Sequence, residues 1–204
     1  MHFTTPEILA MVIGASFAAG LNVYATIATL GLLARTHTLQ LPPNLHLLEN
    51  WWVIGAALAL FLVEFFADKI PAFDLIWNAL HTFIRVPIAA LLGYQATTQL
   101  SPQAQMLTAL MAGGIALASH GGKTAIRAAV TPSPEPLSNI GLSFGEDAVA
   151  IGLTWFATTH PYWAAAATAV MLVVVIVLVR LVVRALRSLF QGAARRIDQL
   201  GEAA

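Results

Sequence analysis

The sequence contains no cysteine and few charged residues of either sign. Without cysteine, the 204-residue chain has no disulfide, no thiolate nucleophile and no cysteine-ligated metal cluster. Charged residues make up 10% of the chain, whereas a soluble globular domain carries roughly 25%. Ten Lys and Arg balance ten Asp and Glu, so there is no basic surplus to bind a phosphate backbone. We therefore expect no nucleic-acid partner.

Apolar residues are abundant instead, at 58% of the chain with a mean hydropathy of +0.77. Runs without Lys, Arg, Asp or Glu cover residues 8–34, 51–63, 86–122 and 148–179. The first is longer than the roughly 7–15 apolar residues of a signal peptide and long enough for the roughly 20 of a membrane span. The last two are each about twice a span, with breaks at Ser101-Pro102 and His160-Pro161, and each predicts a helical hairpin.

These runs predict an all-α integral membrane protein with about six transmembrane helices and one or two amphipathic or re-entrant segments between them. The six helices are expected at about residues 7–35, 50–67, 83–100, 103–120, 139–159 and 162–190. Residues 1–190 would form a single polytopic membrane domain, and residues 191–204 a short basic and polar tail.

Arginines gather at the C-terminal end, at positions 180, 184, 187, 195 and 196. The positive-inside rule places this end in the cytoplasm, and six spans would return the N-terminus to the same side. The lipid bilayer is the expected partner, in the bacterial cytoplasmic (inner) membrane. Trp51, Trp52, Tyr162 and Trp163 would then form an aromatic belt at the opposite interface.

The first polar segment, residues 67–85, begins with Asp68 and Lys69 and carries a helical stripe of Asp74, Asn78, His81 and Arg85. Three interpretations are open. In the first, the segment is an amphipathic helix that lies flat at the interface. In the second, it is a helix that re-enters the protein and faces a water-filled cavity. In the third, its Asp and Arg form an ion pair that only holds two spans together.

The second polar segment places His120, Lys123 and Arg127 on one face if the helix continues through Gly121-Gly122. The two glycines would equally suit the start of a new half-helix, whose free N–H groups bind anions. In a third interpretation, the two basic residues are ordinary cytoplasmic anchors at a span end.

Asn139, Ser143, Glu146 and Asp147 form a further stripe along the fifth expected span. A charge at mid-span costs about 2.5–3.5 kcal/mol on insertion scales, so acids there are expected to be paired, protonated or functional. Alternatively, the span begins near Ala148 and leaves both acids at the interface.

Two earlier spans carry isolated polar residues. Asn22, with Tyr24 beside it, lies near the middle of the first span, and we expect it to bond to a neighbouring helix rather than to a substrate. Glu64 ends the second span among phenylalanines and is expected to pair with a base of the first polar segment.

The polar residues together resemble a bacterial membrane family labelled domain of unknown function 4126. The resemblance rests on Ala67-Asp-Lys-Ile-Pro71, His81-Thr-Phe-Ile-Arg85 and Glu146-Asp147, and extends to about Leu153. It also rests on a set of single positions: Gly20, Asn22, Tyr24, Asp74, Trp77, His120, Lys123, Arg127, Ser133, Pro136, Ser138 and Asn139. Asn78 departs from the pattern, which has an acid there. The resemblance implies a multi-pass fold but no activity.

Three function classes remain open. The favoured one is a small transporter or channel with a polar intramembrane site, either proton-linked or for an anionic solute or lipid headgroup. A structural subunit of a membrane complex is the alternative, and an intramembrane enzyme with Asp74 and His81 as base and orienter is the third. The expected binding residues are Asp68, Lys69, Asp74, His81, Arg85, His120, Lys123, Arg127, Glu146 and Asp147, supported by Asn22, Tyr24, Asn139 and Ser143. We expect no catalytic residue, metal or cofactor, and leave homo-oligomerisation open.

Overall fold

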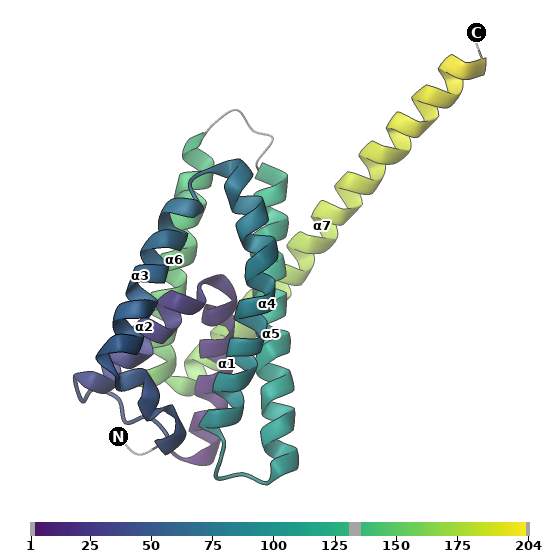
Figure 1. The fold of residues 1–204 in the computed structure, drawn as a ribbon. Coiled ribbons are helices and arrows are strands. Elements are labelled where there is room, and N and C mark those ends of the chain that lie inside the picture. Colours follow the sequence, from purple (N-terminus) through teal and green to yellow (C-terminus); the bar gives the residue numbers. More distant parts are fainter. Residues whose placement is uncertain (1–2, 131–135, 203–204) are drawn as a thin grey trace.

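The computed structural model describes residues 3–130 and 136–202, and these form helices joined by short links. Figure 1 shows the helices gathered in one bundle from which the end of the last helix projects. In chain order the elements are α1 (Thr5–Leu21), α2 (Val23–Arg35), the 3₁₀ helix η1 (Pro43–Glu49), α3 (Trp51–Ala67), α4 (Pro71–Ala96), α5 (Pro102–Val130), α6 (Pro136–Thr159) and α7 (Pro161–Glu202).

The first apolar run is not one helix, which corrects the single span expected over residues 7–35. The helix stops at Leu21, and Asn22 has an extended backbone with φ −151° and ψ 102°. The chain then returns, because Ile8 and Val12 of α1 lie in the same core cluster as Leu30 and Ala34 of α2. Figure 1 shows this pair as a bent hairpin whose turn lies inside the bundle.

The longer helices then run along the bundle in alternating directions (Figure 1). The expected breaks at Ser101-Pro102 and His160-Pro161 are confirmed, since α5 begins at Pro102 and α7 at Pro161. The N-terminal end lies at the opposite end of the bundle from the tip of α7 (Figure 1). The expectation that both termini face the cytoplasm stays a prediction.

Both polar segments belong to long helices. The first is continuous with the following apolar stretch in α4, so it does not form a separate helix. The second runs through Gly121-Gly122 without interruption in α5, so no half-helix starts there. A Cβ at Gly122 would meet the side chain of Val175, so glycine here allows α7 to approach α5 closely.

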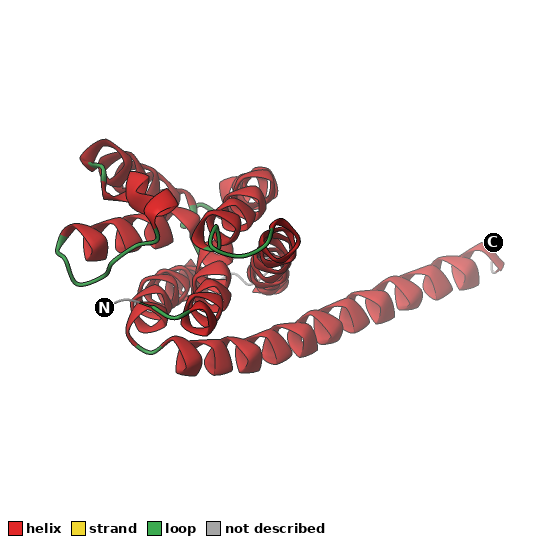
Figure 2. Cartoon of the chain, turned by 90° about the horizontal axis from the view of Figure 1, so that it is seen from below, coloured by secondary structure: helices red, strands yellow, loops and turns green. Residues whose placement is uncertain are grey.

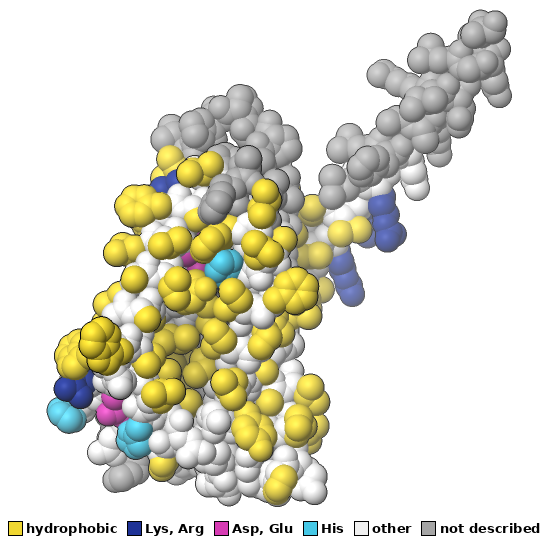
Figure 3. Space-filling view, viewed as in Figure 1, with side chains coloured by type: hydrophobic (Ala, Val, Ile, Leu, Met, Phe, Trp, Pro, Cys, Tyr) yellow, Lys and Arg dark blue, Asp and Glu magenta, His cyan; other side chains and the backbone are white. Residues whose placement is uncertain are grey.

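The side chains are distributed as in a protein surrounded by lipid. Large apolar side chains such as Leu62, Phe83, Leu107 and Val173 are exposed, whereas the charged side chains Glu64, Arg85 and Arg127 are fully buried. Figure 3 shows apolar side chains covering most of one face of the bundle.

Two stretches, Ile76–Ala96 and Pro161–Ala185, are long and apolar enough to cross a membrane. A third candidate is the pair formed by η1 and α3, which meet at a bend of 64°.

The hairpin is central to the packing. In Figure 2, seen along the bundle, the last helix leaves the other helices and extends toward the C-terminal end. Apolar side chains of α1, such as Met11 and Phe17, pack with Leu153 and Ala157 of α6 and with α7. The turn at Asn22 therefore sits where α4, α5 and α6 bring their polar stripes.

Candidate functional site: a buried ion-pair network at a broken helix

Three basic and three acidic side chains from four helices form one buried network. The carboxylate of Glu64 pairs with Arg85 and lies 3.5 Å from the Lys123 ammonium. Lys123 is also 2.9 Å from Asp68 and 3.3 Å from Glu146. Arg127 completes the network by pairing with Asp68, at 3.0 Å, and with Glu146. Each positive charge is therefore balanced by a carboxylate in a region with little access to water.

The network forms because its helices present charges at helical spacing toward one another. Lys123 and Arg127 are four residues apart on α5, and Glu64 and Asp68 are four apart at the end of α3, so each pair shares a face. Burial alone would raise the pKa of Asp68, which lies just past α3. The Lys123 ammonium and the Arg127 guanidinium outweigh this effect and hold that pKa below its usual value. The two bases therefore favour the ionised form of Asp68.

The broken end of α1 joins the network through its backbone. Arg85 donates to the carbonyl of Gly20 at 3.3 Å, and Lys123 donates to that of Leu21 at 3.3 Å. The last carbonyls of a helix lack internal partners and carry partial negative charge, so two cations are favourable there. On the other side of the break, the Asn22 side chain caps α2 by accepting from the N–H of Ala25 at 2.9 Å.

Close packing brings the broken end to α5. A Cβ on Gly20 would overlap the hydroxyl of Ser119 and the carbonyl of Ala116. The Ser119 hydroxyl instead donates to the carbonyl of Phe17 at 2.9 Å. The absence of a side chain at Gly20 therefore lets the helix end reach the basic residues of α5.

The partners of the two buried histidines fix the protonation of one ring and place one hydrogen on the other. His120 Nδ1 lies 2.7 Å from a guanidinium nitrogen of Arg85, which can only donate, so this ring nitrogen accepts. Its Nε2–H then donates to the carbonyl of Asn78 at 3.0 Å or to the Thr82 hydroxyl at 2.9 Å.

His81 carries its fixed hydrogen on the other ring nitrogen, Nδ1. Its Nδ1 faces the carbonyl of Trp77 at 2.8 Å, which can only accept, so this nitrogen carries the hydrogen. The Nε2 forms a hydrogen bond with the hydroxyl of Tyr24 at 3.1 Å, in which either group can donate.

Asp147 stands next to the network without joining an ion pair among the described side chains. Its Oδ1 accepts from Asn22 Nδ2 at 2.9 Å. Its Oδ2 is buried and has no hydrogen-bond partner in the part of the chain that the structure describes. As expected, Asn22 bonds to a neighbouring helix. Ser143, one turn earlier on α6, is also buried, with its hydroxyl unpaired among the described residues.

Of the predicted site residues, the structure brings together Asp68, Arg85, His120, Lys123, Arg127, Glu146, Asp147, Asn22, Tyr24, Ser143 and His81. Lys69 lies at the edge of the site. Its ammonium donates to the carbonyl of Phe65 at 2.7 Å and lies over the Phe65 ring. Asp74 and Asn139 lie in α4 and α6, but their side chains fall outside the residues that the structure describes.

The list of expected binding residues omitted Glu64, Asn78 and Thr82, which the structure places in the site. The sequence held a signal for the first, because Glu64 is the one acid within the apolar stretch of α3. The expected pairing of Glu64 with a base of the first polar segment is confirmed by its contact with Arg85.

A groove of about 490 Å³ leads from the side of the bundle to the network. Leu142 and Val149 of α6, Ile126 of α5 and Val175 of α7 line it, together with Lys123 and Glu146. The Glu146 side chain is 12% exposed, whereas that of Lys123 is fully covered. The groove therefore gives the network a lateral opening with mostly apolar walls.

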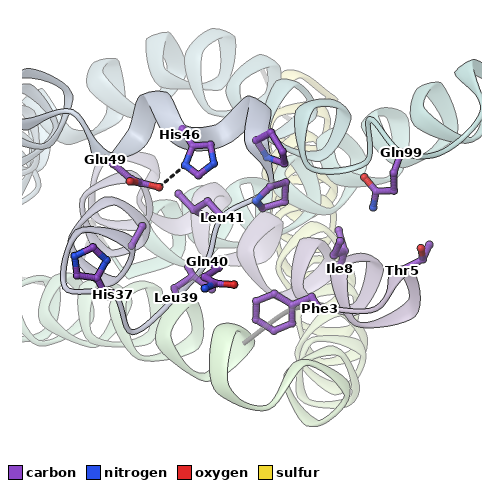
Figure 4. Close-up of a pocket in the computed structure, with 13 residues that line it drawn as sticks. Phe3, Thr5, Ile8, His37, Leu39, Gln40, Leu41, His46, Glu49 and Gln99 are labelled. Carbon is purple, nitrogen blue, oxygen red and sulfur yellow. Dashed lines mark hydrogen bonds and ion pairs between the residues drawn. The ribbon is translucent and has the colours of Figure 1, made fainter.

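A second pocket, of about 630 Å³, lies where the first turn of α1 meets the segment between α2 and α3. Figure 4 shows His46 and Glu49 pointing toward each other at its edge, at 2.6 Å. Gln99, which follows α4, also lines this pocket, so it lies at the end of the bundle away from the network. In the described part of the chain, no three His, Asp or Glu side chains are grouped as metal ligands.

Comparison with known proteins agrees with the family suggested by the polar motifs. The family model described as Domain of unknown function (DUF4126) matches residues 9–181. The match includes α1 from its second turn onward, all of α2 and every residue of the network. No curated protein and no solved structure matches the chain. Since the family model covers most of the sequence, the chain belongs to the DUF4126 family.

Proposed function

We propose that this protein is a small, proton-linked transporter of the bacterial inner membrane, with the ion-pair network at the α1–α2 break as its polar intramembrane site. The observation that carries the proposal is the helix break itself. Interrupted helices whose ends face charged groups are a recurring way to build a binding site within a membrane. Here the carbonyls of Gly20 and Leu21 face Arg85 and Lys123.

The fold supports a specific membrane arrangement for this transporter. In it, α3 to α7 cross the bilayer, and α1 with α2 forms a re-entrant hairpin in place of the sixth span. At 1.5 Å per residue, the 24 residues of α6 extend about 36 Å, more than the roughly 30 Å hydrocarbon core. With the arginines of α7 in the cytoplasm, the N-terminus would lie on the opposite side.

Proton linkage fits the site better than an anionic solute or lipid headgroup. Arg85, Lys123 and Arg127 each pair with a carboxylate, so an anion would have to displace an acid from each base that it bound. A proton needs no such displacement, because it binds to a carboxylate directly. Protonation of an acid would also loosen the pair that it forms, and so couple binding to movement of the helices.

A structural subunit is the second candidate. The specific observation in its favour is the mutual pairing of the buried charges, which would hold four helices together without any substrate. The two functions differ in one property: a transporter must open its site to each side of the membrane, whereas a structural network stays closed.

The experiment uses the natural lack of cysteine. Single variants Ser119→Cys and Ser143→Cys place a thiol next to the network, and Ser16→Cys is the matched control, because Ser16 is also buried but lies two turns before the break. A membrane-impermeant thiol reagent is applied from each side at several pH values. We expect both site thiols to be labelled from both sides of the membrane, in proportions that change with pH. If neither is labelled more than Ser16→Cys, transport through this site is refuted in favour of the structural role.

A further inference from the structure

The described buried charges at the helix break are out of balance by one acid. Three carboxylates pair with the three bases of the network, and Asp147 is a fourth acid with no base of its own among the described side chains. The side chain of Asp147 is buried, at 5% exposure. One of its oxygens has a single donor, Asn22, and the other has none in the described structure.

The groups that face Asp147 do not supply the missing charge. Lys123 of α5 is the base of the network that acts on Asp147, but it contacts three other carboxylates. Glu64 and Asp68 of α3 add negative charge. Lys69 lies close enough to interact, but its ammonium is held by the Phe65 carbonyl and ring. Ala150, the next turn of α6, belongs to an apolar cluster with Phe17 and Leu21 of α1, so that side adds no charge.

An ionised carboxylate is costly in such surroundings. Burying a charge without a partner is strongly unfavourable, and a carboxyl group in this position is expected to take up a proton instead. The added hydrogen would lie on Oδ2, the oxygen that has no partner, and it would leave the bond from Asn22 to Oδ1 in place. His120 is a poor alternative, because its bond from Arg85 already fixes its ring as neutral.

We propose that Asp147 is the residue that binds the transported proton, and that Asn22 links its protonation to the helix break. This inference rests on the proposed transport function and identifies its ion and its residue. Asn22 donates to Asp147 with its nitrogen and caps α2 with its oxygen. A hydrogen bond to a charged carboxylate is shorter and roughly twice as strong as one to a neutral group. Loss of the proton therefore tightens the contact between α6 and the hairpin, and uptake relaxes it.

The direct test is infrared difference spectroscopy of the purified protein during a pH titration. The wild type is expected to show the carbonyl band of a protonated carboxylic acid at neutral pH. The band should be lost in Asp147→Asn and retained in the matched control Glu146→Gln, which removes the neighbouring, fully paired acid. A band that persists in Asp147→Asn, or its absence from the wild type at every pH at which the protein is folded, would overturn the assignment.

A second variant covers the case in which Asp147→Asn does not fold. Asn22→Ala leaves Asp147 intact and removes the one donor to its Oδ1 among the described residues, so the carbonyl band should move to higher frequency. An unchanged band would show that the proton is on another residue.

Labelling of Ser143→Cys then separates this inference from the transport function. If Asp147 binds a proton but labelling does not respond to pH, the assignment stands and transport fails. If labelling remains pH-dependent in Asp147→Asn, transport stands and the assignment fails.

Discussion

Replacement of Arg85 by methionine should be among the most destabilising single changes in the protein. Arg85 is fully buried. The change removes its pair with Glu64, its bond to the Gly20 carbonyl and its bond to His120. Removing one partner of a buried ion pair costs about 3–5 kcal/mol, because the other charge stays buried without compensation. Lys123, at 3.5 Å from Glu64, offsets part of this loss, so we expect about 3 kcal/mol.

A double-mutant cycle tests this reasoning. Reversible unfolding in mixed micelles, followed by tryptophan fluorescence, gives the free energy of unfolding for Arg85→Met, for Glu64→Gln and for the pair. The double variant should be less destabilised than the sum of the two single variants by about 1–3 kcal/mol, as for residues in direct contact. Arg35→Met is the control, since Arg35 only lies over the exposed Trp51 ring, and should cost at most about 1 kcal/mol. Solvent-exposed ion pairs contribute up to about 1 kcal/mol. If Arg85→Met lowered the free energy of unfolding by less than this, the conclusion that water is excluded from the network would be refuted.

Three further predictions concern the hairpin. Gly20→Ala should lower the free energy of unfolding by about 1–3 kcal/mol through overpacking, whereas Gly55→Ala, which has open space around it, should not lower it; thermal unfolding in detergent compares the two. Asn22→Ala should cost about 1–3 kcal/mol, since it removes the cap of α2 and a bond to a buried carboxyl; an unchanged melting temperature would contradict the role given to the break. Finally, thiols introduced by Thr38→Cys and Ser188→Cys should react with an impermeant reagent from opposite sides of the membrane. If both thiols reacted from the same side, the result would favour a full first span over the hairpin.

The sequence was informative where local signals decide the structure. The apolar run of residues 51–63 predicts α3, and Pro102 and Pro161 mark helix starts, because proline at the first position of a helix loses no hydrogen bond. The helical spacing of His120, Lys123 and Arg127 correctly placed them on one face. Glu146 and Asp147 are consecutive in the sequence. Their spacing did not indicate that, among the described residues, Glu146 forms ion pairs and Asp147 does not.

The break at Asn22 was not predictable from its neighbours, which are apolar on both sides. A helix interrupted in apolar surroundings needs partners for its free backbone groups, and here two of those partners are side chains of α4 and α5. The continuity of α5 through Gly121-Gly122 has a similar origin. Glycine there reflects the approach of Val175 on α7 rather than a helix end, and that contact joins residues distant in the sequence.

The same distant contacts set an order for biogenesis. The carbonyl of Gly20 is satisfied by a side chain 65 residues later, and that of Leu21 by one 102 residues later. At synthesis rates of roughly 5–20 residues per second, the break lacks these partners for several seconds after its own residues leave the ribosome. During that interval residues 8–34 form an uninterrupted apolar stretch long enough to enter the bilayer as a single helix. We therefore expect the native hairpin to form late, once α5 has arrived with its lysine.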